Sequence, residues 1–137
     1  MKKKLLLAYL CLALAACSQS TTEKSTQKSN SHLFNKDFIK QNAEIGISVK
    51  EAKNRFGKEK MSGKVEHSEV SLFDQVKKGY DYKPDLENVA FKQIKDGKVK
   101  GQLFIIFKDE KAFMFSFFYR GTGGDLGVCG QPGSNRT

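Results

Sequence analysis

The chain has 137 residues, with 24 lysines and arginines against 15 aspartates and glutamates, which gives a formal net charge of +9 at pH 7. This length allows one small domain. A basic chain attracts anionic partners, nucleic acid among them. The lysines are scattered, with no dense basic run, zinc-finger spacing or arginine cluster. We therefore interpret the charge as a solubilising surface and expect no nucleic-acid binding.

The N-terminus has the pattern of an export signal. Three lysines, Lys2–Lys4, precede the twelve apolar residues Leu5–Ala16. A helix that crosses a bilayer core of about 30 Å requires ~20 apolar residues. The shorter segment suits the apolar region of a signal peptide.

The signal ends in Leu14-Ala15-Ala16-Cys17, which resembles the lipobox of bacterial lipoproteins. The resemblance implies a signal peptide over residues 1–16, cleavage between Ala16 and Cys17, and a diacylglyceryl group on the Cys17 thiol. Two acyl chains, of the palmitate kind, are enough for stable anchoring to a membrane. The alternative is an ordinary secretory signal, cut after an Ala-x-Ala sequence, in which Cys17 is incidental.

Residues 17–33 are predicted to form a lipidated cysteine followed by a disordered tether. Ser, Thr, Gln, Lys and Asn dominate residues 18–33, and Leu33 is the one apolar side chain. Such a segment buries too little surface to offset its ordering entropy. As a random coil it reaches roughly 22 Å, which would hold a domain close to the membrane.

Two short helices are expected at the start of the domain. Asn35 can cap a helix that contains Phe38 and Ile39. Ser48 and Glu51 have the spacing of a capping box, with Ser at the N-cap and Glu three residues later. Gly57 stands where a glycine would end this second helix.

Alternating apolar residues predict four strands after the helices. They are Val65–Phe73, Asn88–Lys95, Val99–Phe107 and Phe113–Tyr119. Asp96-Gly97 predicts a hairpin turn between the second and third strands, Lys108–Lys111 predicts the next turn, and Lys77–Glu87 predicts a long connection whose edge Tyr80 and Tyr82 line. The predicted fold is α+β, with two short N-terminal helices packed on a four-stranded antiparallel β-meander over residues 34–120.

Residues 121–137 contain six glycines, and we expect a Gly-rich flexible tail. Its composition departs abruptly from the strand before it, which a frameshifted gene end would also produce. The tail also carries Cys129, which is the one cysteine after Cys17. If Cys17 is lipidated, Cys129 therefore has no second thiol with which to form an intramolecular disulfide.

No catalytic constellation is found in the sequence. His67 and Glu69 can share one face of a strand, but a surface histidine among charged residues is the simpler interpretation. There is no His-Glu-x-x-His or Cys-x-x-Cys. We expect a protein that is not an enzyme, with no catalytic residues, metal or cofactor.

Eleven phenylalanines suggest an apolar core. One set of apolar side chains lies on the other face of the predicted sheet, away from this core. Phe104, Ile106, Met114 and Phe118 are predicted on the sheet face opposite Phe115 and Phe117. They form either a second buried layer or an exposed partner surface.

The segment Gly46–Lys58 resembles one found in small envelope lipoproteins. These are the outer-membrane-assembly lipoproteins of the SmpA/OmlA type and the β-lactamase-inhibitor-protein-like lipoproteins of Gram-positive bacteria. The matching residues are Gly46, Ser48, Glu51, Ala52, Phe56 and Gly57. The resemblance implies a scaffold that binds other proteins without catalysis.

The expected function is that of a non-catalytic lipoprotein on the extracytoplasmic face of the cell membrane. A Gram-positive cell is favoured. The protein would be lipid-anchored through the diacylglyceryl group of Cys17 and would bind an envelope protein or ligand. Two alternatives stay open. One is a superinfection-exclusion lipoprotein of a phage or mobile element, and the other is an inhibitor of a secreted hydrolase.

Overall fold

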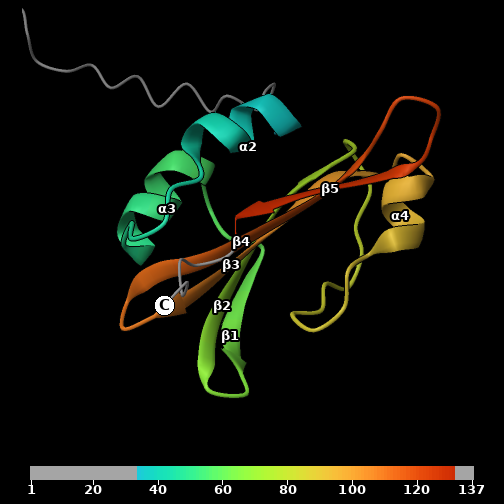
Figure 1. Ribbon diagram of the computed structural model, residues 1–137. Helices are drawn as coiled ribbons and strands as arrows, with labels where there is room; N and C mark the ends of the chain where they lie inside the picture. The colour runs from blue at the N-terminus through green and yellow to red at the C-terminus, as the bar shows by residue number, and fades with distance from the viewer. Residues whose placement is uncertain (1–33, 132–137) are drawn as a thin grey trace, which may run out of the picture. The chain divides into compact units, whose positions relative to one another are not determined.

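The computed structural model describes residues 34–131. The helices are α2 (Lys36–Asn42), α3 (Val49–Phe56) and α4 (Phe91–Lys95), and the strands are β1 (Met61–Val65), β2 (Ser68–Val76), β3 (Val99–Lys108), β4 (Lys111–Arg120) and β5 (Leu126–Gln131) (Figure 1). The expected signal peptide, lipidated Cys17 and tether, residues 1–33, lie outside the described residues. So do residues 132–137 of the expected tail.

The five strands form one antiparallel sheet in the order β1-β2-β3-β4-β5, so each strand pairs with its neighbours in sequence. With helices beside an antiparallel sheet, the domain is α+β. The sequence predicts four strands, and this number is wrong. Part of the first predicted strand is a hairpin turn at Glu66 and His67, which joins β1 to β2.

The second predicted strand, Asn88–Lys95, is also wrong, because its last five residues form α4. The Asp-Gly pair that signals a hairpin instead ends this helix. The Gly97 N–H donates to the Ile94 carbonyl (3.0 Å) and the Lys98 N–H donates to the Gln93 carbonyl (2.9 Å). These two bonds, with Gly97 at φ 73°, are a Schellman motif. Burial of Ile94, which is 0% exposed, holds this short helix against the domain.

The expected flexible tail is wrong for residues 126–131, because they form β5 on the free edge of β4. The glycines there make room for neighbouring groups. A Cβ on Gly127 would lie 2.3 Å from Cζ of Tyr119, so the tyrosine ring occupies the space that a side chain would fill. The glycine content suggested a disordered tail. Glycine is instead required at Gly127 because the Tyr119 ring of the adjacent strand lies against it.

A bulge changes which residues of β4 face the core. Ile106 pairs with Met114, but Phe107 pairs with Ala112, so Phe113 is the extra residue. The sequence predicts Phe113 on the same face as Phe115. The structure instead places Ala112, which is 2% exposed, in the core beside Phe115.

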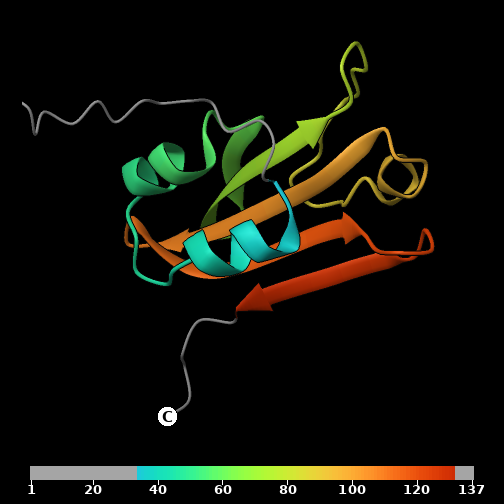
Figure 2. The same cartoon turned by 90° about the horizontal axis from the view of Figure 1, so that it is seen from above.

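The first face of the sheet packs against α2 and α3. Asn35 Oδ1 accepts from the Phe38 N–H (2.9 Å), and Ser48 and Glu51 form both bonds of the predicted capping box. In Figure 2 these helices lie over the sheet, α2 beside β4. Ile39 and Ala52 point into the main core, which contains Phe73, Leu103, Ile105, Phe107, Phe115 and Phe117.

The opposite face of the sheet carries a second, smaller apolar cluster. Its buried members are Val70, Leu72 and Phe104, and half-buried side chains of the long connection, Leu86 and Val89, pack on it. Both faces of the central strands are therefore covered, and the connection between β2 and α4 forms the second cover (Figure 1). This cover is incomplete, and the candidate site lies in the opening.

Candidate functional site

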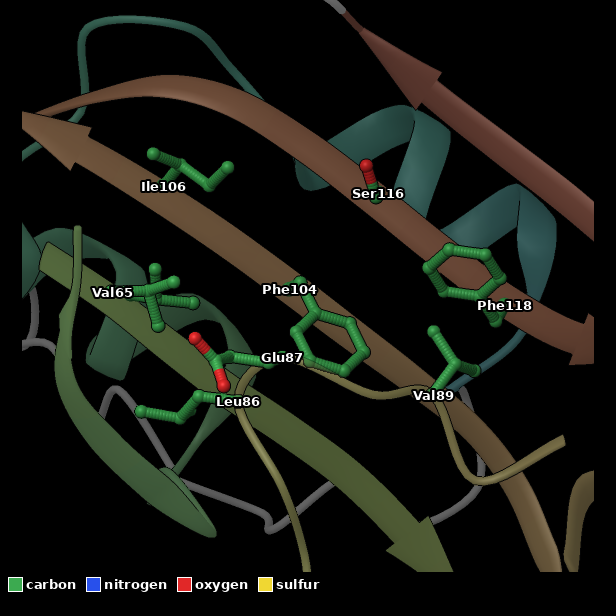
Figure 3. Close-up of a pocket in the computed structure, with 9 residues that line it drawn as sticks. Val65, Leu86, Glu87, Val89, Phe104, Ile106, Ser116 and Phe118 are labelled. Atoms are coloured by element: carbon green, nitrogen blue, oxygen red, sulfur yellow. The ribbon is translucent and has the colours of Figure 1, made fainter. Parts of the chain in front are cut away.

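A pocket of about 350 Å³ opens on the second face of the sheet. Figure 3 shows the side chains of β3 and β4 on one side and those of the connection on the other. The apolar lining residues are Val65, Val70, Leu86, Val89, Phe104, Ile106 and Phe118. Glu87 and Ser116 add the polar groups. The pocket is thus an apolar hollow with one carboxylate and one hydroxyl at its wall.

The floor of the pocket is an aromatic pair from adjacent strands. The rings of Phe104 and Phe118 meet edge to face with centroids 5.9 Å apart, and Phe91 of α4 meets the other side of Phe118 in the same way. Such contacts are worth ~0.5–1.5 kcal/mol beyond burial. The floor is therefore held in place by packing on two sides.

Hydrogen bonds shape the wall formed by residues 85–89. Asp85 accepts from the Glu87 N–H (2.8 Å) and from Asn88 Nδ2 (2.7 Å), as aspartate does in Asx turns. The bond from Asn88, followed by that from Glu87, lowers the pKa of Asp85. Gly63 of β1 lets this wall approach closely, since a Cβ there would lie 3.1 Å from Cδ1 of Leu86.

A polar cluster around one buried side chain fixes both ends of this wall to the sheet. Gln102 of β3 is 0% exposed. Its Nε2 donates to Tyr82 Oη (2.7 Å), and its Oε1 accepts from the Ala90 N–H (2.8 Å). Tyr82 Oη in turn donates to Asp74 Oδ2 (2.6 Å). Since Asp74 and Gln102 are cross-strand partners, the sheet holds Tyr82 with two side chains. We call Asp74, Tyr82, Gln102 and Ala90 the polar clamp.

The titrations of the clamp follow from its burial. Desolvation raises the pKa of Asp74, against the lowering effect of the Tyr82 hydrogen bond. Desolvation and the nearby Asp74 carboxylate raise the pKa of Tyr82. The tyrosine therefore keeps its proton and donates a hydrogen bond to Asp74.

Three of the four predicted surface residues line the pocket. Phe104 is 8% exposed and forms the floor, while Ile106 and Phe118 are half-buried. Met114 pairs with Ile106 but is not a lining residue. The set is thus neither a fully buried layer nor a flat exposed patch.

Exposed apolar side chains extend the pocket toward β5. Phe91 is 48% exposed and contacts Phe118. Val128, which is 61% exposed, is the cross-strand partner of Phe118. Sequence reasoning missed both, because it assigned Phe91 to a strand and Val128 to a tail.

The clamp was missed as well, although one signal for it exists. Gln102 stands in the apolar run of β3, on the face of Phe104 and Ile106. A polar residue that replaces an apolar one in such a run must find a buried partner. The sequence does not identify that partner, which comes from twenty residues away.

Two titratable residues that the sequence singled out, His67 and Cys129, do not line the pocket. No group of three His, Cys, Asp or Glu side chains within 34–131 could hold a metal ion. His67 is exposed in the β1–β2 turn, and burial raises the pKa of the half-buried Cys129 thiol. The pocket offers space for an apolar group, with the Ser116 hydroxyl and the Glu87 carboxylate in its lining.

Comparisons of the chain with protein-family models, with curated proteins and with solved structures give no match. Among the residues that the structure describes, no helix is long and apolar enough to span a bilayer.

Proposed function

We propose that the protein is a lipid-anchored, non-catalytic binding protein of the cell envelope, whose domain captures a partner protein through the pocket of β3 and β4. The observation that supports this best is the apolar pocket of about 350 Å³ with exposed Phe91 and Val128 beside it. Exposed apolar side chains around a hollow are typical of protein-binding sites. An apolar side chain of the partner would fill the hollow, and Phe91 and Val128 would contact the surface around it.

The proposed anchor is Cys17, with a diacylglyceryl group on its thiol and cleavage after Ala16. The domain would then face the outside of the cell membrane, at the end of the 17–33 tether. The resemblance of Gly46–Lys58 to the SmpA/OmlA-type and β-lactamase-inhibitor-protein-like lipoproteins supports a binding scaffold of this kind.

Anchoring is tested by labelling cells with a fatty-acid probe. We expect label on the wild-type protein and none on Cys17→Ala, because the thiol is the acyl acceptor. Cys11→Ala is the matched control, since Cys11 would leave with the signal peptide. Equal labelling of wild type and Cys17→Ala would contradict the anchor.

Partner binding is tested by photo-crosslinking on intact cells. A photoreactive residue at Ser116, in the pocket wall, should form one discrete adduct with an envelope protein. The same residue at Asn54, exposed on α3 across the sheet, is the control and should give none. The adduct should weaken in Val128→Ser, which removes apolar surface without touching the core.

Equal adducts from both positions, or none from Ser116, would overturn the proposed surface. The identity of the captured protein distinguishes the three roles that the sequence leaves open. A resident envelope protein supports a binding lipoprotein, a DNA-entry receptor supports exclusion, and a secreted hydrolase supports inhibition.

A further inference from the structure

A second pocket of about 350 Å³ lies at the C-terminal end of β4, beside the start of α2. Its lining includes three cations, Lys36, Lys100 and Arg120, and three apolar side chains, Phe34, Val99 and Tyr119. No carboxylate is among its lining residues, and the neighbouring Asp37 and Asp96 lie outside it. This pocket differs in chemistry from the apolar one and shares no residue with it.

The three cations have no salt bridge within residues 34–131, where the ion pairs are Lys53–Glu59, Arg55–Glu44 and Lys60–Asp81. All three are exposed at the mouth of one hollow. Like charges that face a common space repel one another, and an anion in that space would remove the repulsion. The charge of the pocket therefore selects for an anionic ligand.

The fold gives the Arg120 guanidinium a defined place. A Cβ on Gly97 would lie 3.1 Å from Nη1, and a Cβ on Gly124 would lie 3.5 Å from Nη2. Both glycines are in turns with positive φ, 73° and 86°. The guanidinium thus lies against two turn glycines, which have no side chain to exclude it. A planar guanidinium held in this way suits the two oxygens of a phosphate, which it can bind with parallel hydrogen bonds.

An aromatic wall adjoins the cations. The rings of Tyr119 and Phe117 are stacked with centroids 5.4 Å apart, and Phe34 meets Phe117 edge to face at 5.4 Å. Phe34 and Tyr119 are half-buried, so part of each ring is open to the pocket. A bare ion would leave this apolar surface uncovered, whereas a ligand with a carbon moiety beside its charge would cover it.

We propose that this pocket binds a phosphate ester, with the phosphate at Arg120, Lys100 and Lys36 and the esterified carbon group against Tyr119 and Phe34. The same chemistry occurs in phospholipid headgroups and in soluble phosphodiester polymers. A protein held near a membrane would meet both. The proposal does not depend on the partner surface above, since the two pockets have separate walls.

The test is a titration of the full-length protein in neutral detergent. Binding is measured by calorimetry and by intrinsic tyrosine fluorescence, which tryptophan does not mask because the chain has none. The probes are glycerophosphoglycerol, dihexanoyl-phosphatidylglycerol and uncharged glycerol. We expect saturable binding of both phosphodiesters, none of glycerol, and weaker binding as salt is added. Tighter binding of the lipid would assign the site to a headgroup. Equal affinities would assign it to a soluble phosphodiester.

Arg120→Gln and Lys100→Gln should each weaken binding about tenfold, the effect of losing one charge-assisted contact. Lys64→Gln is the matched control, because it removes the same charge from an exposed position on β1 and should bind like wild type. Melting curves identify a variant that fails to fold, and the exposed Lys100 provides the second measurement in that case. No saturable binding at millimolar probe, or equal loss in Lys64→Gln, would overturn the proposal.

Discussion

Gln102 holds both ends of the pocket wall, because its Nε2 lies 2.7 Å from Tyr82 Oη while its Oε1 lies 2.8 Å from the Ala90 nitrogen. The residues between these two points include Leu86, Glu87 and Val89, which line the pocket. One buried side chain on β3 therefore sets the position of a segment that has no regular secondary structure. The shape of the pocket depends on this contact.

Gln102→Leu should lower the free energy of unfolding by about 1–3 kcal/mol, because it leaves the Ala90 N–H without its buried acceptor. Urea denaturation measures the loss. Amide hydrogen exchange over residues 83–89 should also speed up, since the wall loses its attachment at both ends. Gln41→Leu, the same change at an exposed position of α2, should stay within ±0.5 kcal/mol of wild type. Unchanged exchange over 83–89 would show that apolar contacts alone hold the wall.

Asp74→Asn should change how stability depends on pH. Burial raises the pKa of Asp74 above 3.8 in the folded protein, so the folded state binds the proton more tightly than the unfolded state. The contribution of Asp74 to stability is then greatest below pH 3.8 and is lost as pH rises through the folded pKa. The stability of wild type relative to Asp74→Asn should therefore be highest below pH 3.8 and should fall as pH rises through the folded pKa of Asp74.

Asp81→Asn provides a control of opposite sign. Hydrogen bonds from Lys60 and from the Tyr82 backbone lower the pKa of Asp81. Wild type should therefore gain stability relative to Asp81→Asn as pH rises toward 3.8, and this gain should be complete above that pH. Denaturation curves at several pH values measure both differences. If the Asp74 difference rises with pH, its carboxylate is stabilised as an anion and the assigned cause is wrong.

Local hydrogen bonds account for the start of α2 and of α3, whereas α4 was predicted as a strand. Asn35 and Ser48 cap α2 and α3 through bonds that span three residues, so nothing distant in the sequence is needed to predict them. Alternation predicted β3 and β4 because the side chains of Leu103, Ile105, Phe115 and Phe117 are all buried on one face. The sequence pattern of each of these elements is complete within a window of about ten residues.

Longer-range contacts decided what the sequence did not predict. Asp96-Gly97 fits a hairpin and a helix end equally well, and burial of Ile94 selects the helix. Gly127 suggests a flexible tail until the ring of Tyr119 is placed over it. The wall of the pocket depends on Gln102, which meets its partners only after β3 and the connection have packed together. A single sequence can indicate on which element such a residue lies, but it does not identify the distant residue that it contacts.

Gly101→Ala should destabilise the domain by about 1–3 kcal/mol, as expected for overpacking. A Cβ there would lie 2.6 Å from Cε2 of Phe117, which is 0% exposed and has no free space to move into. Loss of chain entropy in the unfolded state would alone predict a gain of ~0.4–1 kcal/mol for this change, so the sign of the effect is informative. Gly63→Ala is the control, because its Cβ would meet only the flexible end of Leu86, at 3.1 Å. Thermal melts compare the two. A rise in melting temperature for Gly101→Ala would show that Phe117 can shift.

Phe115→Ala should be the most damaging of these changes and should exceed Phe118→Ala. Phe115 is 2% exposed and packs under Phe56 of α3, with ring centroids 6.4 Å apart. Truncation of a buried phenylalanine costs about 3–5 kcal/mol, and small domains have only about 5–15 kcal/mol in total, so the variant should be partly unfolded. Phe118 is half-buried at the pocket and loses mainly its ring contacts with Phe91 and Phe104, worth ~0.5–1.5 kcal/mol each. Urea midpoints measured on both variants test this order. Equal losses would mean that the second face of the sheet is packed as firmly as the first, and the pocket would then be a minor gap in a core instead of a place where a partner enters.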